Sequence, residues 1–270
     1  MPRTLLNQHM TSDRVSVGIA GLDDVLGGGL PASRLYLVHG TPGVGADRRT
    51  LRVTKLRGSS YRTGNHDFVI QTGGVRVYPR LVAAEHRSTF GIEPMSIGLA
   101  ELDQLLGGGL DRGAATLLMG PAGTGKSGIA MQFACAAAER GECVSMFLFE
   151  ERMGTFHARA ASLGMPITRY IDQGLIRLQQ IDPAEIPPDQ FTDLVRQGIE
   201  QDGAKLLVVD SMSGYLMAMP DRHALSLQLH ELLAYTGDQG VAAPAMLGPG
   251  VNVALQRGAR AAPVASRSHR

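Results

Sequence analysis

The stretch "AATLLMGPAGTGKSGIAMQFACAAAER", residues 114–140, constrains the fold more than any other part of the chain. Its first residues, 114–120, form an apolar run that ends in glycine, which is typical of a buried strand. Residues 127–140 are rich in helix formers, and Gly141 follows them as a stop signal. A strand, a glycine loop with the spacing G-x-x-x-x-G-K-S and a helix, in that order, predict a phosphate-binding loop.

Each part of this loop has a physical role in binding phosphate. The glycines let backbone N–H groups approach the phosphates, and the helix N-terminus adds a partial positive charge. Lys126 is expected to reach the β- and γ-phosphates, and the Ser127 hydroxyl is expected to ligate Mg²⁺. A glycine-rich turn before an ordinary helix is the disfavoured alternative. The expected phosphate-binding residues are Gly120, Pro121, Ala122, Gly123, Thr124, Gly125, Lys126 and Ser127.

Further strands and helices alternate after the loop. Apolar or alternating runs predict strands, and amphipathic runs predict helices between them. Such alternation is typical of a parallel α/β sheet covered by helices. The predicted strands are 143–149, 175–181 and 205–210, and the predicted helices are 152–163, 189–203 and 222–240.

Three carboxylates stand at the carboxyl ends of predicted strands, where ligands bind in such sheets. Asp210 suits the second Mg²⁺ carboxylate of a phosphate-loop enzyme, but an aspartate there could also cap a helix. Glu150 and Glu151 could orient an attacking water or hydroxyl, or could favour the dipole of the next helix. The residues alone leave both pairs of alternatives open.

An internal repeat relates residues 16–45 to residues 96–125, the segment that leads into the loop. Both copies share a Leu-Asp pair and a glycine triplet. The first copy keeps the loop glycines but continues with Ala46-Asp47, where the motif needs lysine and then serine or threonine. Since an aspartate would repel phosphate, the first copy is a defective version of the second.

Composition excludes several classes of protein. With 270 residues, 44% of them hydrophobic and 19% charged, the chain fits a soluble globular protein with two domains. No apolar run approaches the ~18 residues of a membrane helix, and the start does not resemble a signal peptide. Cys135 and Cys143 are too few for a disulfide framework. We therefore expect a cytoplasmic protein without a membrane partner.

Basic residues gather in two segments. Residues 46–90 contain far more Lys and Arg than Asp and Glu, and no acidic residue follows Asp238. The first segment looks strand-like and lacks an aromatic stacking series, so a DNA-associated function ranks last. The basic C-terminal end fits a solvated, disordered tail better than a nucleic-acid patch.

Several motifs together resemble KaiC-like ATPases of the RecA superfamily: "GLDDVLGGGLP", "ELDQLLGGGLDRG", "GPAGTGKS", "FLFEE" and "VVDSMSGYLMAMP". The resemblance covers nearly all of residues 14–240. It implies a RecA-like α/β fold, a parallel sheet with flanking helices, and it implies ATP and Mg²⁺ as cofactors. It also implies a hexameric ring, slow ATP hydrolysis and, in some members, serine/threonine autophosphorylation in a signalling or clock-like role. Glu150 and Glu151 match the family's catalytic pair, and Asp210 matches its Mg²⁺ aspartate.

The first domain departs from the family pattern. The repeat copies lie much closer together than two full domains allow, and residues 46–85 resemble the last strands of the family's first domain, with a hairpin signal at Gly73-Gly74. About 45 residues before the join cannot enclose a sheet covered on both faces. We therefore expect an internally deleted, β-rich remnant over 1–90, an incomplete RecA-like ATPase domain over 91–240 and a basic tail over 241–270.

The end of the chain also departs from the pattern. The family continues there with a strand between the loop strand and the Asp210 strand, but Pro244 cannot donate to a ladder. Either residues 241–248 fill that position poorly or the sheet has a gap. A C-terminally truncated chain of this kind is expected to be a weak or inactive ATPase and autokinase. A non-catalytic nucleotide-binding or subunit-interaction module is the alternative, and a RadA-like DNA-associated ATPase ranks below it.

Overall fold

The structure is a computed structural model that describes residues 13–32, 36, 48–56, 59–218 and 222–248. The chain divides into two compact units, Met1–Arg80 and Leu81–Arg270. Each unit is described by itself below. Within the described residues, no helix is long and apolar enough to cross a membrane.

The second unit is built on a five-stranded parallel sheet with the strand order β6-β10-β9-β7-β8. All five residues of β7, β9 and β10 are buried, as expected for strands covered on both faces. The predicted α/β class with a RecA-like parallel sheet is thereby confirmed. The strands are β6 (Ala115–Met119), β7 (Val144–Leu148), β8 (Ile176–Gln180), β9 (Leu206–Asp210) and β10 (Ala243–Leu247).

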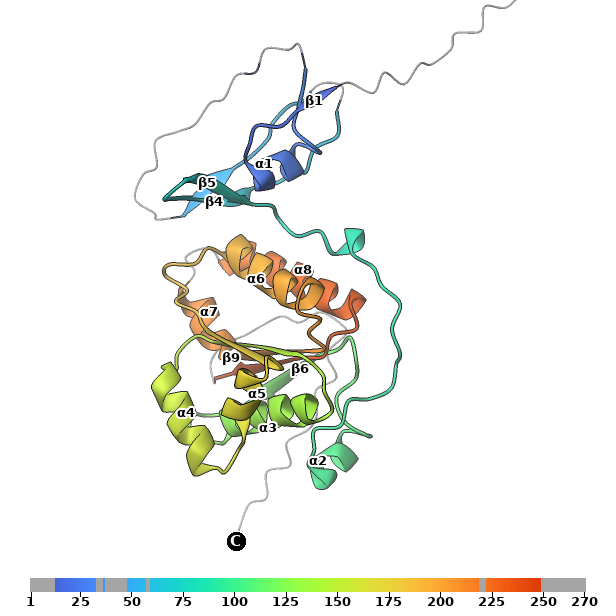
Figure 1. The fold of residues 1–270 in the computed structure, drawn as a ribbon, viewed down its shortest axis with the longest axis vertical. Coiled ribbons are helices and arrows are strands. Elements are labelled where there is room, and N and C mark those ends of the chain that lie inside the picture. Colours follow the sequence, from blue (N-terminus) through green and yellow to red (C-terminus); the bar gives the residue numbers. More distant parts are fainter. Residues whose placement is uncertain (1–12, 33–35, 37–47, 57–58, 219–221, 249–270) are drawn as a thin grey trace, which may run out of the picture. The chain divides into compact units, whose positions relative to one another are not determined.

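Helices cover both faces of this sheet (Figure 1). Successive residues of a strand point to opposite faces, so Met146 of β7 joins the core beneath α3 while Phe147 joins the core beneath α6. There Phe147 meets Phe191 edge to face, with ring centroids 5.2 Å apart. One face carries α3 (Lys126–Glu139), α4 (Met153–Ser162) and α5 (Ile167–Asp172); the other carries α6 (Pro188–Glu200), α7 (Met212–Ala218) and α8 (Arg222–Asp238).

Strand β10 fills the position between β6 and β9, which the sequence left open. It pairs with β6 along its whole length, but within β10 its ladder with β9 has the single pair Ala245 and Val209. Alternate residues of a parallel strand bond to opposite neighbours, and Ala242 faces β9 through bonds to Lys205 and Leu207. Pro244 therefore also faces β9, and its missing N–H weakens that ladder.

The apolar content of β10 explains why the strand forms despite the proline. Met246 and Leu247 are 0% and 1% exposed, and they belong to the two cores on opposite faces of the sheet, Met246 to one and Leu247 to the other. Pro244 thus removes a single ladder donor, which leaves one backbone acceptor of β9 without that bond, at a cost of roughly 1–3 kcal/mol for an unpaired buried group. The sheet of the second unit thus includes Ala243–Leu247, and residues 249–270 lie outside the described part. The bounds 91–240 for this domain stay a prediction.

The two related segments of the sequence fold alike. Each makes a short helix whose aspartate accepts a hydrogen bond from a preceding serine: Ser16 to Asp23 at 2.5 Å, and Ser96 to Asp103 at 2.6 Å. The glycine triplets that follow both helices have positive φ throughout. The helices are α1 (Ala20–Val25) in the first unit and α2 (Ala100–Leu105) in the second, which also contains the short 3₁₀ helix η1 (Ala83–Glu85).

The first unit is small and antiparallel. Its three-stranded sheet has the order β3-β4-β5, and the β4–β5 hairpin turns at Gly73, as the glycine pair predicted. A buried Asp67 pairs with Arg48 at 2.8 Å. The first copy's loop and its Ala46-Asp47 pair lie outside the described residues. The strands are β1 (Arg14–Val15), β2 (Leu30–Pro31), β3 (Arg49–Leu51), β4 (His66–Gln71) and β5 (Gly74–Tyr78).

Candidate functional site

The glycine loop connects β6 to α3 in the predicted way. Gly123 and Gly125 have φ of +81° and +85°, a left-handed conformation that favours glycine, and helix α3 begins at Lys126. The Lys126 ammonium donates to the carbonyl oxygens of Gly120 and Pro121, at 2.8 Å each. Its side chain therefore curls over the loop, and residues 121–125 are exposed. The loop offers backbone N–H groups and one cation on the same surface.

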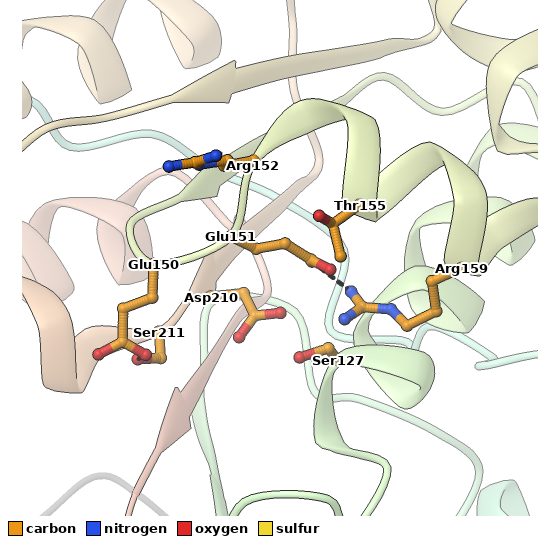
Figure 2. Close-up of a pocket in the computed structure, with 8 residues that line it drawn as sticks. All are labelled: Ser127, Glu150, Glu151, Arg152, Thr155, Arg159, Asp210 and Ser211. Atoms are coloured by element: carbon orange, nitrogen blue, oxygen red, sulfur yellow. Dashed lines mark hydrogen bonds and ion pairs between the residues drawn. The ribbon is translucent and has the colours of Figure 1, made fainter.

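Four residues predicted from the sequence line one cleft of about 420 Å³ (Figure 2). They come from three elements, because the carboxyl ends of parallel strands meet at one edge of the sheet. Ser127 is the second residue of α3, the glutamates follow β7, and the aspartate ends β9. The four residues are Ser127, Glu150, Glu151 and Asp210.

Asp210 is the most buried carboxylate of the cleft, at 8% exposed. Burial raises its pKa, while the hydrogen bond from Ser127 and the charge of Arg159 lower it. Its Oδ2 is among the few buried side-chain atoms of the described residues that have no hydrogen-bond partner. The Asp210 side chain thus accepts a hydrogen bond from Ser127 on another element. This contact favours a role in the cleft over capping of the next helix.

This donor set fits Mg²⁺. Magnesium prefers oxygen ligands, keeps several waters and is commonly bound through one or two carboxylates together with substrate phosphates. The unpartnered Oδ2 of Asp210 and the hydroxyl of Ser127 supply such oxygens. Among the described residues, no group of three or more His, Cys, Asp or Glu side chains forms a metal site from protein alone.

The two glutamates make different contacts. Glu150 accepts a hydrogen bond from the Ser211 hydroxyl at 2.9 Å, and Glu151 accepts one from the Arg159 guanidinium at 2.6 Å. Burial raises the pKa of Glu151, and Arg159 opposes that shift. Both glutamates precede the N-cap residue Arg152, and the first turn of α4 contains no acidic residue. These contacts favour a role in the cleft over a role for the helix dipole.

Sequence reasoning missed the other half of the cleft lining. Arg159 lies two helical turns along α4 and is brought back to Glu151, eight residues earlier, which the i,i+3 and i,i+4 spacings of helical ion pairs do not suggest. Ser211 follows Asp210 directly and could have been noticed for its place at a strand end. The missed residues are Arg152, Thr155, Arg159 and Ser211.

A parallel sheet with a glycine loop after its first strand, a hydroxyl at the helix start and an aspartate at the end of β9 defines a phosphate-loop nucleoside triphosphatase fold. The family model described as "ATPase: KaiC" matches residues 95–243. The chain therefore belongs to the KaiC family of ATPases.

Curated relatives give the same result. The chain is 30% identical to the circadian clock protein KaiC2 of Synechocystis sp. over 62% of this chain and 30% of that protein. It is 29% identical to the circadian clock oscillator protein KaiC of Synechococcus elongatus over 62% of this chain and 32% of the relative. The chain thus spans about a third of the length of the curated relatives it matches.

Replacing Asp210 with asparagine is expected to stabilise the chain without nucleotide by about 1 kcal/mol, because it removes an unsatisfied buried charge that costs roughly 1–3 kcal/mol. Asparagine keeps an acceptor for Ser127. Since the folded-state pKa of Asp210 is raised, the wild-type free energy of unfolding falls as pH rises from about 3.9 through that pKa. The variant lacks this fall.

Thermal unfolding with and without Mg²⁺ and ATP at about pH 4 and about pH 8 tests this expectation. The stabilisation should be larger at the higher pH, and Mg²⁺-dependent protection by ATP should weaken in the variant. A variant that melts below wild type at both pH values would contradict the cost that we assign to the buried carboxylate.

Proposed function

We propose that this chain binds ATP with Mg²⁺ in the cleft beside the glycine loop and hydrolyses it. The observation that carries the proposal is the convergence of Ser127, Asp210 and the glutamate pair on one cleft, at the carboxyl edge of the sheet. Each supplies an oxygen at a place where a phosphate-loop enzyme uses one. Family membership supports the same activity.

In this proposal, the loop binds the phosphates and the aspartate side of the cleft holds the metal. Backbone N–H groups of residues 122–125 and the Lys126 ammonium contact phosphate oxygens. Ser127 and Asp210 would hold Mg²⁺, which would neutralise charge on the bound phosphates. The unpartnered, buried Oδ2 of Asp210 supports this assignment.

The glutamates orient the water that attacks the γ-phosphate. A carboxylate in this position accepts a proton from the attacking water as the bond to phosphorus forms. Ser211 fixes the direction of Glu150, and Arg159 fixes that of Glu151. The two contacts hold the carboxylates without consuming all of their acceptor positions.

Assembly, autophosphorylation and domain history are further parts of the proposal. The resemblance implies a homo-oligomer and a serine/threonine autokinase with a signalling partner, and we keep both as proposals; the matched relatives are circadian clock proteins. The assignment of 1–90 to a shortened first domain also stays a proposal. The gap in the sheet that contributed to the expectation of weak activity is filled by β10, so the rate itself must be measured.

Titration with a fluorescent ATP analogue is expected to show one saturable, Mg²⁺-dependent site per chain, together with slow release of inorganic phosphate. Radiolabelled γ-phosphate on the protein would support the autokinase part. Binding without phosphate release would favour the non-catalytic module. Tight binding of single-stranded DNA would favour the DNA-associated alternative, and a second nucleotide site would contradict a defective first copy.

A further inference from the structure

Arg159 lies in the cleft and has no role in the function proposed so far beyond contacting Glu151. It extends from α4 towards Ser127 and Asp210 (Figure 2). Its Nη2 donates to Glu151 Oε2 at 2.6 Å, and its side chain remains 31% exposed. The guanidinium therefore stands at the wall of the cleft, open to a molecule that enters it.

The Arg159 guanidinium lies close to a buried aromatic ring of the same helix. Helix α4 buries Phe156 completely, and the Arg159 guanidinium carbon lies 5.9 Å from the centre of that ring. Contact with an aromatic face restricts where a guanidinium can move. The charge is thus held in place by packing as well as by Glu151.

Arg159 keeps hydrogen-bond donors to spare. A guanidinium has five N–H donors in a planar fork. The bond to Glu151 uses one donor, and the Nε of Arg159 is buried, so the donors left for a molecule in the cleft are those on the two terminal nitrogens. A fork with unused donors suits a phosphate, which it can bind through two parallel hydrogen bonds.

The charge of Arg159 acts on both sides of the cleft. It lowers the pKa of Glu151 and that of Asp210, against the effect of burial in each case. The guanidinium therefore lies near both the expected metal carboxylate and the expected water-orienting carboxylate. In a phosphate-loop enzyme the group bound between these two is the terminal phosphate, since the loop holds the others.

We propose that Arg159 contacts the terminal phosphate of a bound nucleoside triphosphate and is the residue through which this cleft distinguishes ATP from ADP. Glu151 competes with that phosphate for the guanidinium. When the triphosphate is bound, Arg159 donates to the terminal phosphate in addition to Glu151 or in place of it. The Glu151 carboxylate is then free to accept from the attacking water. This inference rests on the proposed binding of ATP in the cleft.

A purely structural ion pair would behave differently. If Arg159 only anchored Glu151, its removal would alter the affinities for ATP and ADP equally, or alter neither. If it contacts the terminal phosphate, only the triphosphate is affected. The ratio of the ATP and ADP affinities therefore changes only if Arg159 contacts the terminal phosphate.

The experiment measures the dissociation constants of a non-hydrolysable ATP analogue and of ADP, both with Mg²⁺. The variants are Arg159→Ala, Arg159→Lys and Glu151→Gln. Arg177→Ala is the matched control, because Arg177 is a surface residue of β8 paired with Asp202, outside the cleft. Circular dichroism checks that each variant is folded.

We expect Arg159→Ala to lower the affinity for the ATP analogue by ~10–100-fold, the size of one or two charge-assisted hydrogen bonds. The affinity for ADP should fall by less than ~3-fold. Arg159→Lys should lie between alanine and wild type, since it keeps the charge but loses the fork. Glu151→Gln should raise the affinity for the analogue a few-fold, because the side chain that competes for Arg159 loses its charge. Arg177→Ala should match wild type.

An unchanged ratio of ATP to ADP affinity in a folded Arg159→Ala would overturn this inference while leaving the proposed function intact. A wild-type chain that binds neither nucleotide would overturn both. If the alanine variant does not fold, Arg159→Lys decides: an affinity ratio equal to that of wild type counts against the contact, and a reduced ratio supports it.

Discussion

Replacing Lys126 with alanine is expected to weaken ATP binding by at least ~10²-fold, because the ammonium would lose charge-assisted bonds to two phosphates at ~1.5–3 kcal/mol each. The side chain begins at the first residue of α3 and already lies over the loop, 2.8 Å from the carbonyl oxygens of Gly120 and Pro121. No other lysine occurs in a complete loop motif. The loss of binding therefore cannot be taken over by a neighbouring ammonium.

Lys205→Ala is the matched control. Lys205 is exposed and carries the same charge, and its bonds to Cys143 and Ala242 are made by backbone atoms. Equilibrium titration with a fluorescent ATP analogue should show wild-type affinity for this control and no saturable site for Lys126→Ala. Near-normal affinity in a folded Lys126→Ala would mean that the cleft binds nucleotide elsewhere, or not through the loop.

The strands of the second unit could be predicted because burial on both faces leaves a simple pattern. β7 and β9 are uninterrupted apolar or nearly apolar runs, and every residue in them is buried. The end of α3 was equally clear, since Gly141 has a φ of +80° just after the helix. These features depend on neighbouring residues in the sequence, so the sequence shows them directly.

Strand β10 could not be predicted with the same ease, because two local rules conflict there. Pro244 argues against a central strand, whereas the apolar residues around it argue for one. The strand forms because its position between β6 and β9 buries Met246 in one core and Leu247 in the other. Such a decision requires the whole sheet and cannot be read from residues 241–248 alone.

The cleft shows the same division between local and distant information. Ser127 was predictable from the loop motif, and Glu150, Glu151 and Asp210 were predictable because each stands at or next to the carboxyl end of a parallel strand. Arg159 was not, because its place depends on the direction in which α4 leaves the sheet and on the packing of Phe156 beneath it. Contacts set by the rotation of a helix are weakly encoded in any single motif.

Replacing both Glu150 and Glu151 with glutamine is expected to lower the rate of ATP hydrolysis by ~10²-fold or more, the usual size of a general-base contribution. ATP affinity should stay within a few-fold, because glutamine keeps the size of each side chain and its acceptor oxygen. Ser211 and Arg159 can still donate to that oxygen. The structure therefore predicts loss of chemistry with little loss of binding.

The space around Glu150 makes this substitution a fair test. A Cβ added at Gly214 would lie 2.8 Å from Glu150 Cγ, so the glycine leaves room for this side chain, and glutamine, which has the same size, fits the same space. Glu93→Gln combined with Glu185→Gln removes the same charge at exposed positions and serves as control. Phosphate release and nucleotide affinity are measured on both double variants. If the cleft variant lost affinity and turnover by the same factor, the glutamates would be acting through their charge on nucleotide binding, and the assignment of the pair to the attacking water would be wrong.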